Sequence, residues 1–175
     1  GEAFDKIGKL LGLPFPGGPA IERAAREGNA AAYDFPRGLR HSSGCDFSFS
    51  GLKTAVRLKV ESLEEITPRI VADVAASAQE AIVQSLVEKS ILAARARSAR
   101  RLYLAGGVAS NGRLRELMKE RLAASGVAVA WPRPEYCTDN AAMIACAASY
   151  HIRAGLIDGL KLNSFARGNL VNWAS

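Results

Sequence analysis

The sequence predicts an α/β fold in which neighbouring strands run parallel. Two short apolar segments, 101–107 and 127–131, have the composition of buried strands, and a helical segment comes after each. A third segment, 46–56, carries alternating phenylalanines and is predicted to begin as a strand. Strands that alternate with long helices are typical of an α/β layer, which is why we expect parallel pairing.

Two short helices joined by a rigid turn are predicted for the amino-terminal part. Apolar residues recur at helical spacing over 3–11, and Gly12 suits the C-terminal end of that helix. The segment PFPGGP at 14–19 combines prolines with glycines, which is typical of a turn. A second helix is expected over about 19–27, and residues 29–45 are expected to be irregular.

One long helix is predicted for the middle of the chain. Before it, Ser50 is expected to cap a shorter helix that begins at Gly51. Pro68 suits a first helical turn, because its missing N–H is not needed there. An apolar stripe at helical spacing then predicts a helix over about 68–97 with one buried face.

The remaining elements are expected to alternate between strand and helix. The strand over 101–107 runs into two glycines, and Asn111 then precedes an amphipathic helix. The strand over 127–131 and a loop over 132–140 lead to a helix of small residues that ends near Gly155. The residues beyond it have no clear period.

The composition is that of a soluble globular protein, with 49% apolar and 23% charged residues in a chain of 175. It excludes a disordered or collagen-like chain.

None of the three cysteines forms a C-x-x-C pair, which excludes a zinc ribbon and predicts a reduced, cytoplasmic setting. We expect no membrane partner, because no apolar run reaches membrane-spanning length and the first residues lack a signal-peptide core. The chain also lacks an initiator Met, and we interpret it as a fragment or a processed piece.

The net charge of +6 permits nucleic acid as a partner. The basic runs Arg95–Arg101 and Arg113–Arg121 are candidates for such contacts. The alternative is a solvated surface of lysines and arginines without a nucleic-acid partner.

The first candidate site is the segment LAGGVASN at 104–111. Backbone N–H groups at Gly106 and Gly107 could approach a phosphate closely, and a helix N-terminus after them favours negative charge. The spacing matches neither G-x-G-x-x-G nor G-x-x-x-x-G-K-[ST], so a Rossmann fingerprint and a P-loop are not supported. Asn111 is alternatively a simple helix cap.

Asp139 is the second candidate. It follows a predicted strand and a loop, so we expect it near the carboxyl end of the sheet, where ligands of open α/β sheets bind. Its carboxylate suits a metal, whereas the alternative is that Asp139 or Asn140 caps the next helix. One carboxylate makes no metal site, and His41 and His151 are solitary in the sequence.

Two further positions have simple structural alternatives. Gly18 belongs either to a turn or to a backbone wall against a ligand. Asp5 lies on the first helix, where its simplest role is an exposed i, i+4 pair with Lys9.

Four blocks of the sequence resemble the TsaD family of tRNA N6-adenosine threonylcarbamoyltransferases, long described as O-sialoglycoprotein endopeptidases or glycoproteases. The blocks are GEAFDK…LGLPFPGGP (1–19), DFSFSGLKTA (46–55), LAGGVASNGRLR (104–115) and RPEYCTDNAAMIA (133–145). They follow the order of the family and extend over the whole chain.

The resemblance implies an actin/hexokinase/Hsp70-like (ribonuclease H-like) fold of two lobes. Residues 1–155 would form the C-terminal nucleotide-binding lobe, and residues 156–175 a tail that packs on the missing N-terminal lobe. Family members transfer threonylcarbamoyl from threonylcarbamoyl-adenylate to N6 of adenosine 37 in tRNAs that read codons beginning with A. They bind the adenylate or ATP, and bacterial members act with TsaB-like and TsaE-like proteins.

Site residues are implied by position in the matching blocks. They are Asp5 and Gly18 for the nucleoside, Asn111 for the adenylate, Gly106 and Gly107 for the phosphate loop, and Asp139 for a metal. Glu22 stands where many members have an aspartate that contacts the ribose.

A divalent metal, Fe²⁺, is implied together with two histidines from an H-x-x-x-H helix upstream of this sequence. Because those histidines are missing here, we expect this chain to be inactive by itself. The surface left bare by the missing lobe would favour self-association. A metal-dependent glycoprotease and a non-catalytic lobe that binds nucleotide or a partner are the alternative functions.

Overall fold

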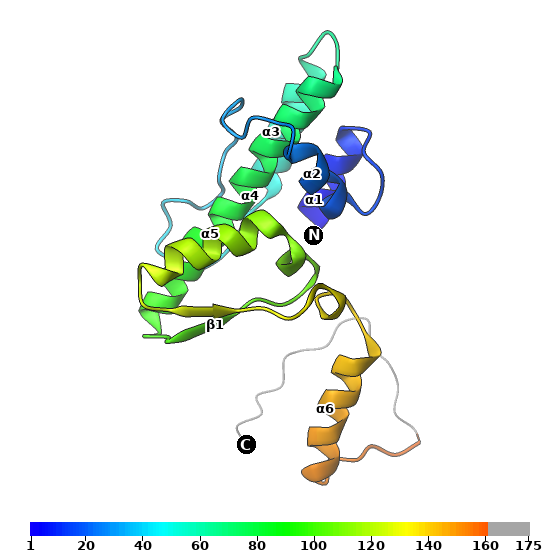
Figure 1. Ribbon diagram of the computed structural model, residues 1–175, viewed down its shortest axis with the longest axis vertical. Helices are drawn as coiled ribbons and strands as arrows, with labels where there is room; N and C mark the ends of the chain where they lie inside the picture. Colours follow the sequence, from blue (N-terminus) through cyan, green and yellow to red (C-terminus); the bar gives the residue numbers. More distant parts are fainter. Residues whose placement is uncertain (161–175) are drawn as a thin grey trace. The chain divides into compact units, whose positions relative to one another are not determined.

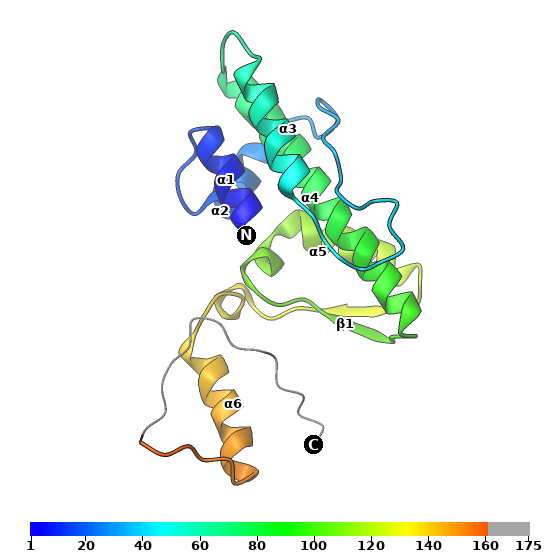
Figure 2. The same ribbon diagram turned by 180° about the vertical axis from the view of Figure 1, so that it is seen from behind.

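The computed structural model describes residues 1–160 (Figures 1 and 2). Contacts divide the chain into a larger unit, Gly1–Thr138, and a second unit that begins at Asp139. The helices and strands are α1 (Glu2–Leu10), α2 (Gly17–Ala25), α3 (Ser50–Glu61), α4 (Pro68–Ala96), β1 (Arg101–Tyr103), α5 (Gly112–Ala123), β2 (Ala128–Ala130) and α6 (Ala141–Arg153). Short 3₁₀ turns lie at Gly107–Ser110 and Pro134–Tyr136. Most of the predicted tail over 156–175 lies outside the described residues, and the lobe boundary at residue 155 stays a prediction.

The connection between α1 and α2 depends on two glycines. Gly12 has a φ of +68°, and the N–H of Leu13 donates to the carbonyl of Gly8 at 2.9 Å, which confirms the predicted helix end. Gly17 approaches α1 so closely that an added Cβ would lie 2.5 Å from the carbonyl oxygen of Phe4. α2 begins at Gly17, earlier than predicted, because its first N–H finds a hydrogen-bond acceptor on α1.

The strand predicted over 46–56 is wrong. Residues 46–49 have no regular structure, and α3 begins at Ser50. The predicted Ser50 cap is wrong as well, because Phe49 occupies the cap position without a side-chain hydrogen bond. Among the described residues only β1 and β2 form a sheet, so this segment has no partner strand. Phe49 packs against the core, whereas Phe47 is 49% exposed and stacks on the ring of Phe49.

α4 confirms the predicted long helix. The hydroxyl of Thr67 caps it by accepting a hydrogen bond from the N–H of Ile70 at 3.3 Å, and Pro68 occupies the first turn. Within the described residues, α4 is the one helix long and apolar enough to cross a membrane by length and composition. This corrects the expectation that no such stretch exists. Because 67% of that stretch is buried inside the structure, it is explained as a core helix.

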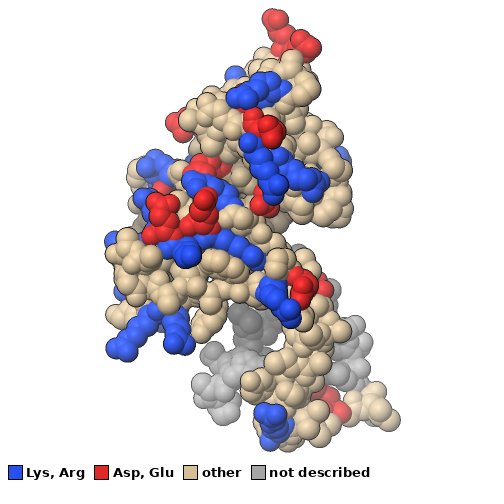
Figure 3. All heavy atoms as spheres, in the orientation of Figure 1, with Lys and Arg blue, Asp and Glu red and all other residues tan. Residues whose placement is uncertain are grey.

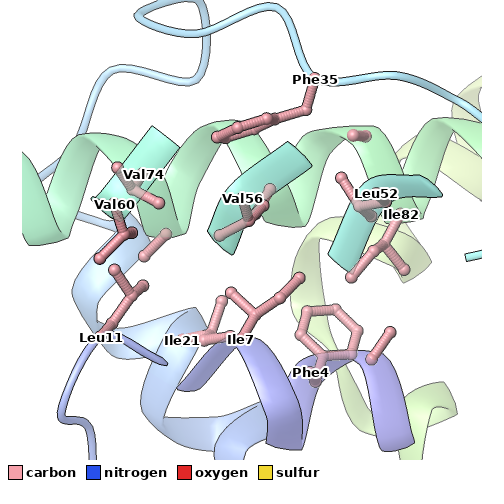
Figure 4. Packing of buried hydrophobic residues seen from close by; sticks show 14 residues of the cluster. Phe4, Ile7, Leu11, Ile21, Phe35, Leu52, Val56, Val60, Val74 and Ile82 are labelled. Atoms are coloured by element: carbon pink, nitrogen blue, oxygen red, sulfur yellow. The ribbon is translucent and has the colours of Figure 1, made fainter. Parts of the chain in front are cut away.

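Two hydrophobic clusters lie along α4. In the first, α1, α2 and α3 pack against α4, and Ile7, Ile21 and Val56 are fully buried at its centre (Figure 4). The second joins α4 to α5 and the strands through Met118 and Leu122. Truncating a buried side chain of this kind to alanine costs about 2–5 kcal/mol for the larger residues, so the clusters hold the helices in place.

β1 and β2 pair in parallel, as predicted, with Tyr103 opposite Ala130. Each strand has three residues, shorter than predicted. The expectation of fully buried strands is wrong, because only the central residues, Leu102 and Val129, pack against the second cluster. In the described structure the helices cover one face of this sheet, and on the other face Tyr103 is 69% exposed.

Candidate functional site

One hollow in the first unit gathers most of the predicted site residues. It has a volume of about 360 Å³. Five of its lining residues were predicted from the sequence: Asp5, Gly18, Glu22, Gly107 and Asn111. They come from α1, α2 and the loop that precedes α5, so the fold brings together segments that are far apart in the sequence.

Asp5 has a different partner from the one predicted. Its Oδ1 accepts a hydrogen bond from the N–H of Gly17 at 2.7 Å, at the first residue of α2. The expected pair with Lys9 is therefore replaced by a carboxylate cap that stabilises the α2 N-terminus. A carboxylate oxygen carries a second lone pair, so Asp5 retains capacity for a ligand hydroxyl.

Glu22 plays the same part for α5. Its Oε1 accepts a hydrogen bond from the N–H of Gly112 at 2.9 Å, at the first residue of that helix. This contact joins α2 to α5 across the hollow and places a negative charge at the positive end of the α5 dipole.

Asn111 is buried at the edge of the hollow, and its cap role is confirmed. Its Oδ1 accepts a hydrogen bond from the N–H of Leu114 at 2.9 Å, and its Nδ2 donates to Oε1 of Gln79 at 2.8 Å. Both ends of the amide are thus engaged within the protein. Each end still has one unused hydrogen-bonding position in principle, because an amide NH₂ donates twice and its oxygen accepts twice.

The glycine pair lies in a different setting from the one expected. Gly106 has φ +84° and ψ 168°, a conformation essentially restricted to glycine. A 3₁₀ turn, Gly107–Ser110, separates the glycines from α5, which begins after Asn111 as predicted. The amides of Gly112 and Leu114 already donate to Glu22 and Asn111, so these two amides at the start of α5 are occupied.

Two side chains that position this loop were not recognised from the sequence. Gln79 on α4 holds Asn111, as described above. Arg115 on α5 donates to the carbonyl of Ala109 and, at 3.3 Å, to both the carbonyl of Pro132 and Sγ of Cys137. A buried glutamine in an apolar stripe and an arginine in a basic run carry no local signal of such contacts.

The basic run Arg113–Arg121 is also partly used inside the fold. Arg113 makes two hydrogen bonds to Glu80 on α4, at 2.8 and 3.0 Å. This hydrogen bonding lowers the pKa of the Glu80 carboxyl and raises the pKa of the guanidinium. Over α5, Lys and Arg side chains alternate with Asp and Glu (Figure 3).

Asp139 is exposed at the start of the second unit. The cap of α6 is Asn140, whose Oδ1 accepts a hydrogen bond from the N–H of Met143 at 2.9 Å. Over residues 1–160, no three His, Cys, Asp or Glu side chains come together in a group that could hold a metal ion. These residues do not fit a complete metal site by themselves.

The chemistry of the hollow favours one kind of ligand. Its charged lining residues are Asp5 and Glu22, while Phe4, Pro16 and Val108 give it apolar walls. Carboxylates accept hydrogen bonds, so they suit hydroxyl groups better than phosphate. The hollow combines apolar walls with a few polar groups, as small-molecule sites in proteins do.

Comparison with known proteins identifies the family. The family model of TsaD, tRNA N6-adenosine threonylcarbamoyltransferase, matches residues 1–146. The chain belongs to the TsaD family.

Curated relatives have the same name, tRNA N6-adenosine threonylcarbamoyltransferase. The relative from Methylocapsa acidiphila is 46% identical over 172 residues, which covers 95% of this chain and 49% of that protein. The relative from Verminephrobacter eiseniae is 51% identical over 156 residues, covering 89% and 45%. The relative from Symbiobacterium thermophilum is 48% identical over 165 residues, covering 94% and 48%. The chain spans about half the length of the curated relatives it matches.

Proposed function

We propose that this chain forms the nucleoside-binding lobe of an enzyme that transfers threonylcarbamoyl from threonylcarbamoyl-adenylate to N6 of adenosine 37 in tRNA. The observation that supports it is the convergence of Asp5, Gly18, Glu22 and Asn111, implied by the family resemblance, on one hollow. The glycoprotease alternative has no observation in its favour, since the relatives are named as transferases.

The two carboxylates would bind the ribose. Asp5 and Glu22 each accept one backbone hydrogen bond, which holds the carboxyl groups in place before a ligand arrives. Their remaining lone pairs would accept hydrogen bonds from the ribose hydroxyls. Gly18 would form the backbone wall against the nucleoside, and Asn111 would contact the adenylate through its remaining N–H.

The loop at Gly106 and Gly107 would lie against the phosphate. Because the amides of Gly112 and Leu114 are engaged, the phosphate contact would come mainly from amides at the start of the 3₁₀ turn. In the transfer, the bond between the threonylcarbamoyl carbonyl carbon and the phosphate oxygen breaks. A bond from that carbon to N6 forms, and AMP and one proton leave. Amides aimed at the phosphate oxygen would stabilise AMP as the leaving group.

The family resemblance implies Fe²⁺ in addition to the adenylate. Asp139 would supply one carboxylate ligand, and the nitrogen ligands would come from the other half of the protein. We therefore propose that the chain alone has no transferase activity. In the whole protein, residues 1–155 would be the C-terminal lobe of a two-lobed, actin-like fold, and the tail would pack on the other lobe. It would act in the cytoplasm with TsaB-like and TsaE-like proteins.

Calorimetric titration with threonylcarbamoyl-adenylate, and with ATP as a second probe, tests the binding role. Glu22→Gln keeps an acceptor for the N–H of Gly112 but removes the charge, and we expect it to weaken binding at least about fivefold, or about 1 kcal/mol. Glu27→Gln, an exposed carboxylate at the end of α2, is the matched control and should bind as the wild type does. Equal affinities for the two variants, or no binding by the folded wild-type chain, would contradict the proposal.

A further inference from the structure

Two loops form one side of the candidate ligand hollow, and they come from the two strands. The first loop contains the 3₁₀ turn Gly107–Ser110, and the second comprises residues 131–138. Because β1 and β2 are parallel, the loops that follow them leave the same edge of the sheet. Gly107 lines the hollow from the first loop and Thr138 from the second. A Cβ added at Gly107 would lie 3.9 Å from Cγ2 of Thr138, so the loops meet at the hollow.

The guanidinium group of Arg115 donates hydrogen bonds to both loops. α5, which carries Arg115 in its first turn, lies along the strands in both views (Figures 1 and 2). In the first loop, Nε donates to the carbonyl of Ala109. In the second loop, Nη2 donates to the carbonyl of Pro132 and to Sγ of Cys137, each at 3.3 Å. Ala109 belongs to the 3₁₀ turn and Cys137 directly precedes Thr138, so these hydrogen bonds act next to the hollow.

The acceptors of Arg115 are neutral, which distinguishes it from Arg113 on the same helix. Arg113 donates to the carboxylates of Glu80 and Glu116. Within residues 1–160, Arg115 forms no ion pair, and its guanidinium lies over the ring of Trp131, 5.5 Å from the ring centroid. Its contacts therefore serve to hold the two loops rather than to neutralise an acid.

These contacts lie in a protected part of the first unit. Ala109 is 2% exposed, Cys137 is 3% exposed, and Arg115 is half-buried. Hydrogen bonds from a charged donor are stronger than neutral ones, and removing the donor leaves buried acceptors unsatisfied. A planar guanidinium with several donors fixes the distance and the angle between two segments, whereas a single donor would leave them free to turn.

We propose that Arg115 is a positioning residue of the hollow, which holds the two loops at the spacing that receives the phosphate of a nucleotide. The inference rests on the proposed function, in which the phosphate lies against Gly106 and Gly107. Arg115 itself is not among the residues that line the hollow, so its effect on a ligand passes through the loops. Binding of a nucleoside phosphate should therefore depend on Arg115, whereas binding of adenosine should not.

Calorimetric titration of the chain with AMP and with adenosine tests this role. The wild type should bind AMP more tightly than adenosine. Arg115→Gln should lose about five- to tenfold in AMP affinity and less than about twofold in adenosine affinity. Arg115→Lys keeps the charge but has a single nitrogen, so it cannot hold both loops and should lose nearly as much AMP affinity. A general loss of structure would instead weaken both ligands equally.

Two sets of variants serve as controls. Arg113→Gln removes a guanidinium from the same helix that bonds to Glu80 and Glu116 rather than to the loops, and it should leave the ratio of AMP to adenosine affinity unchanged. Cys137→Ala removes one acceptor of Arg115 and should lose about two- to threefold in AMP affinity. Cys137→Ser keeps an acceptor at this position and should match the wild type. The Cys137 pair also tests the contact if Arg115→Gln fails to fold.

Amide hydrogen exchange without ligand reports on the loops directly. The N–H groups of Ala109 and Tyr136 each donate to a carbonyl within their own loop, at 2.9 Å. Arg115→Gln should speed the exchange of both amides about tenfold, because both loops lose the group that holds them. Arg113→Gln should leave both exchange rates unchanged.

Equal losses of AMP and adenosine affinity in Arg115→Gln would overturn the inference, as would wild-type AMP affinity in Arg115→Lys or unchanged exchange in either loop. A wild type that binds AMP and adenosine equally would support the nucleoside-binding lobe and overturn this inference. If the wild type binds neither ligand while Arg115→Gln speeds exchange in both loops, the proposed function fails, whereas the positioning of the loops by Arg115 stands.

Discussion

Asn111→Ala should destabilise the first unit by more than a helix-cap loss. Removing Oδ1 leaves the N–H of Leu114 without its cap, at a cost of about 1 kcal/mol. Removing Nδ2 leaves the buried carbonyl of Gln79 without its donor, at a further cost of about 1–3 kcal/mol. The expected total is about 2–4 kcal/mol, a large share of the roughly 5–15 kcal/mol that holds a domain folded.

Urea unfolding followed by far-UV circular dichroism measures this loss. Asn111→Asp is the matched variant, because aspartate caps helices as well as asparagine but replaces the amide donor with a charged acceptor oxygen. It should therefore lose less than the alanine variant. Asn111→Ala, Gln79→Ala and the double variant Asn111→Ala/Gln79→Ala form a double-mutant cycle, and we expect a coupling of about 1 kcal/mol.

Two results would refute the reasoning. One is a loss below about 0.5 kcal/mol for Asn111→Ala, which is less than the cap alone should cost. The other is additivity of the Asn111 and Gln79 losses within about 0.3 kcal/mol, as for independent sites. If the expected loss is found, an adenylate-binding defect in Asn111→Ala is interpretable only at temperatures where the variant stays folded.

Three further predictions follow from particular contacts. Gly17→Ala should destabilise the protein by about 1–3 kcal/mol, because its Cβ would lie 2.5 Å from backbone atoms of α1. Gly18→Ala, with nothing within 4 Å, should shift the melting temperature little. Hydrogen bonding to Arg113 lowers the pKa of the Glu80 carboxyl in the folded state below its ordinary value of 4.5. The ionised carboxylate therefore stabilises the fold fully above pH 4.5, and this stabilisation is lost as the pH falls through the folded-state pKa. The urea midpoint of the wild type should therefore fall more on acidification than that of Arg113→Gln, and equal falls would contradict this. Met118→Ala should cost about 2–5 kcal/mol in the same unfolding assay, and a loss under about 1 kcal/mol would mean that the second cluster collapses around the change.

Local signals in the sequence predicted most helices. Pro68 and the apolar stripe identified α4 because a helix reveals its buried face in its own periodicity. Gly12 and Asn111 marked helix ends because caps involve residues close in sequence. The strand predicted over 46–56 was wrong, because an alternating pattern forms a strand only where a neighbouring strand exists to pair with it.

The roles of the carboxylates in the candidate site were not predictable in the same way. The i, i+4 spacing indicated Lys9 as the partner of Asp5, whereas the structure pairs Asp5 with the N–H of Gly17. Glu22 likewise reaches Gly112, 90 positions further along the chain. Gly17 can approach α1 only because it has no side chain, and that close approach brings the N–H within reach.

The sequence by itself determined the family, the helices with the ends at Gly12 and Asn111, the parallel pairing of the strands, and the residue types of the candidate site. Only the tertiary structure decided which carboxylate meets which helix start, and that Gln79 on α4 holds Asn111. The physical reason is that unpaired N–H groups and solvent-facing charges interact with whatever the fold brings near, at any separation along the chain. Periodicity and capping are local and can be read from neighbouring residues, whereas these contacts exist only after the helices have packed.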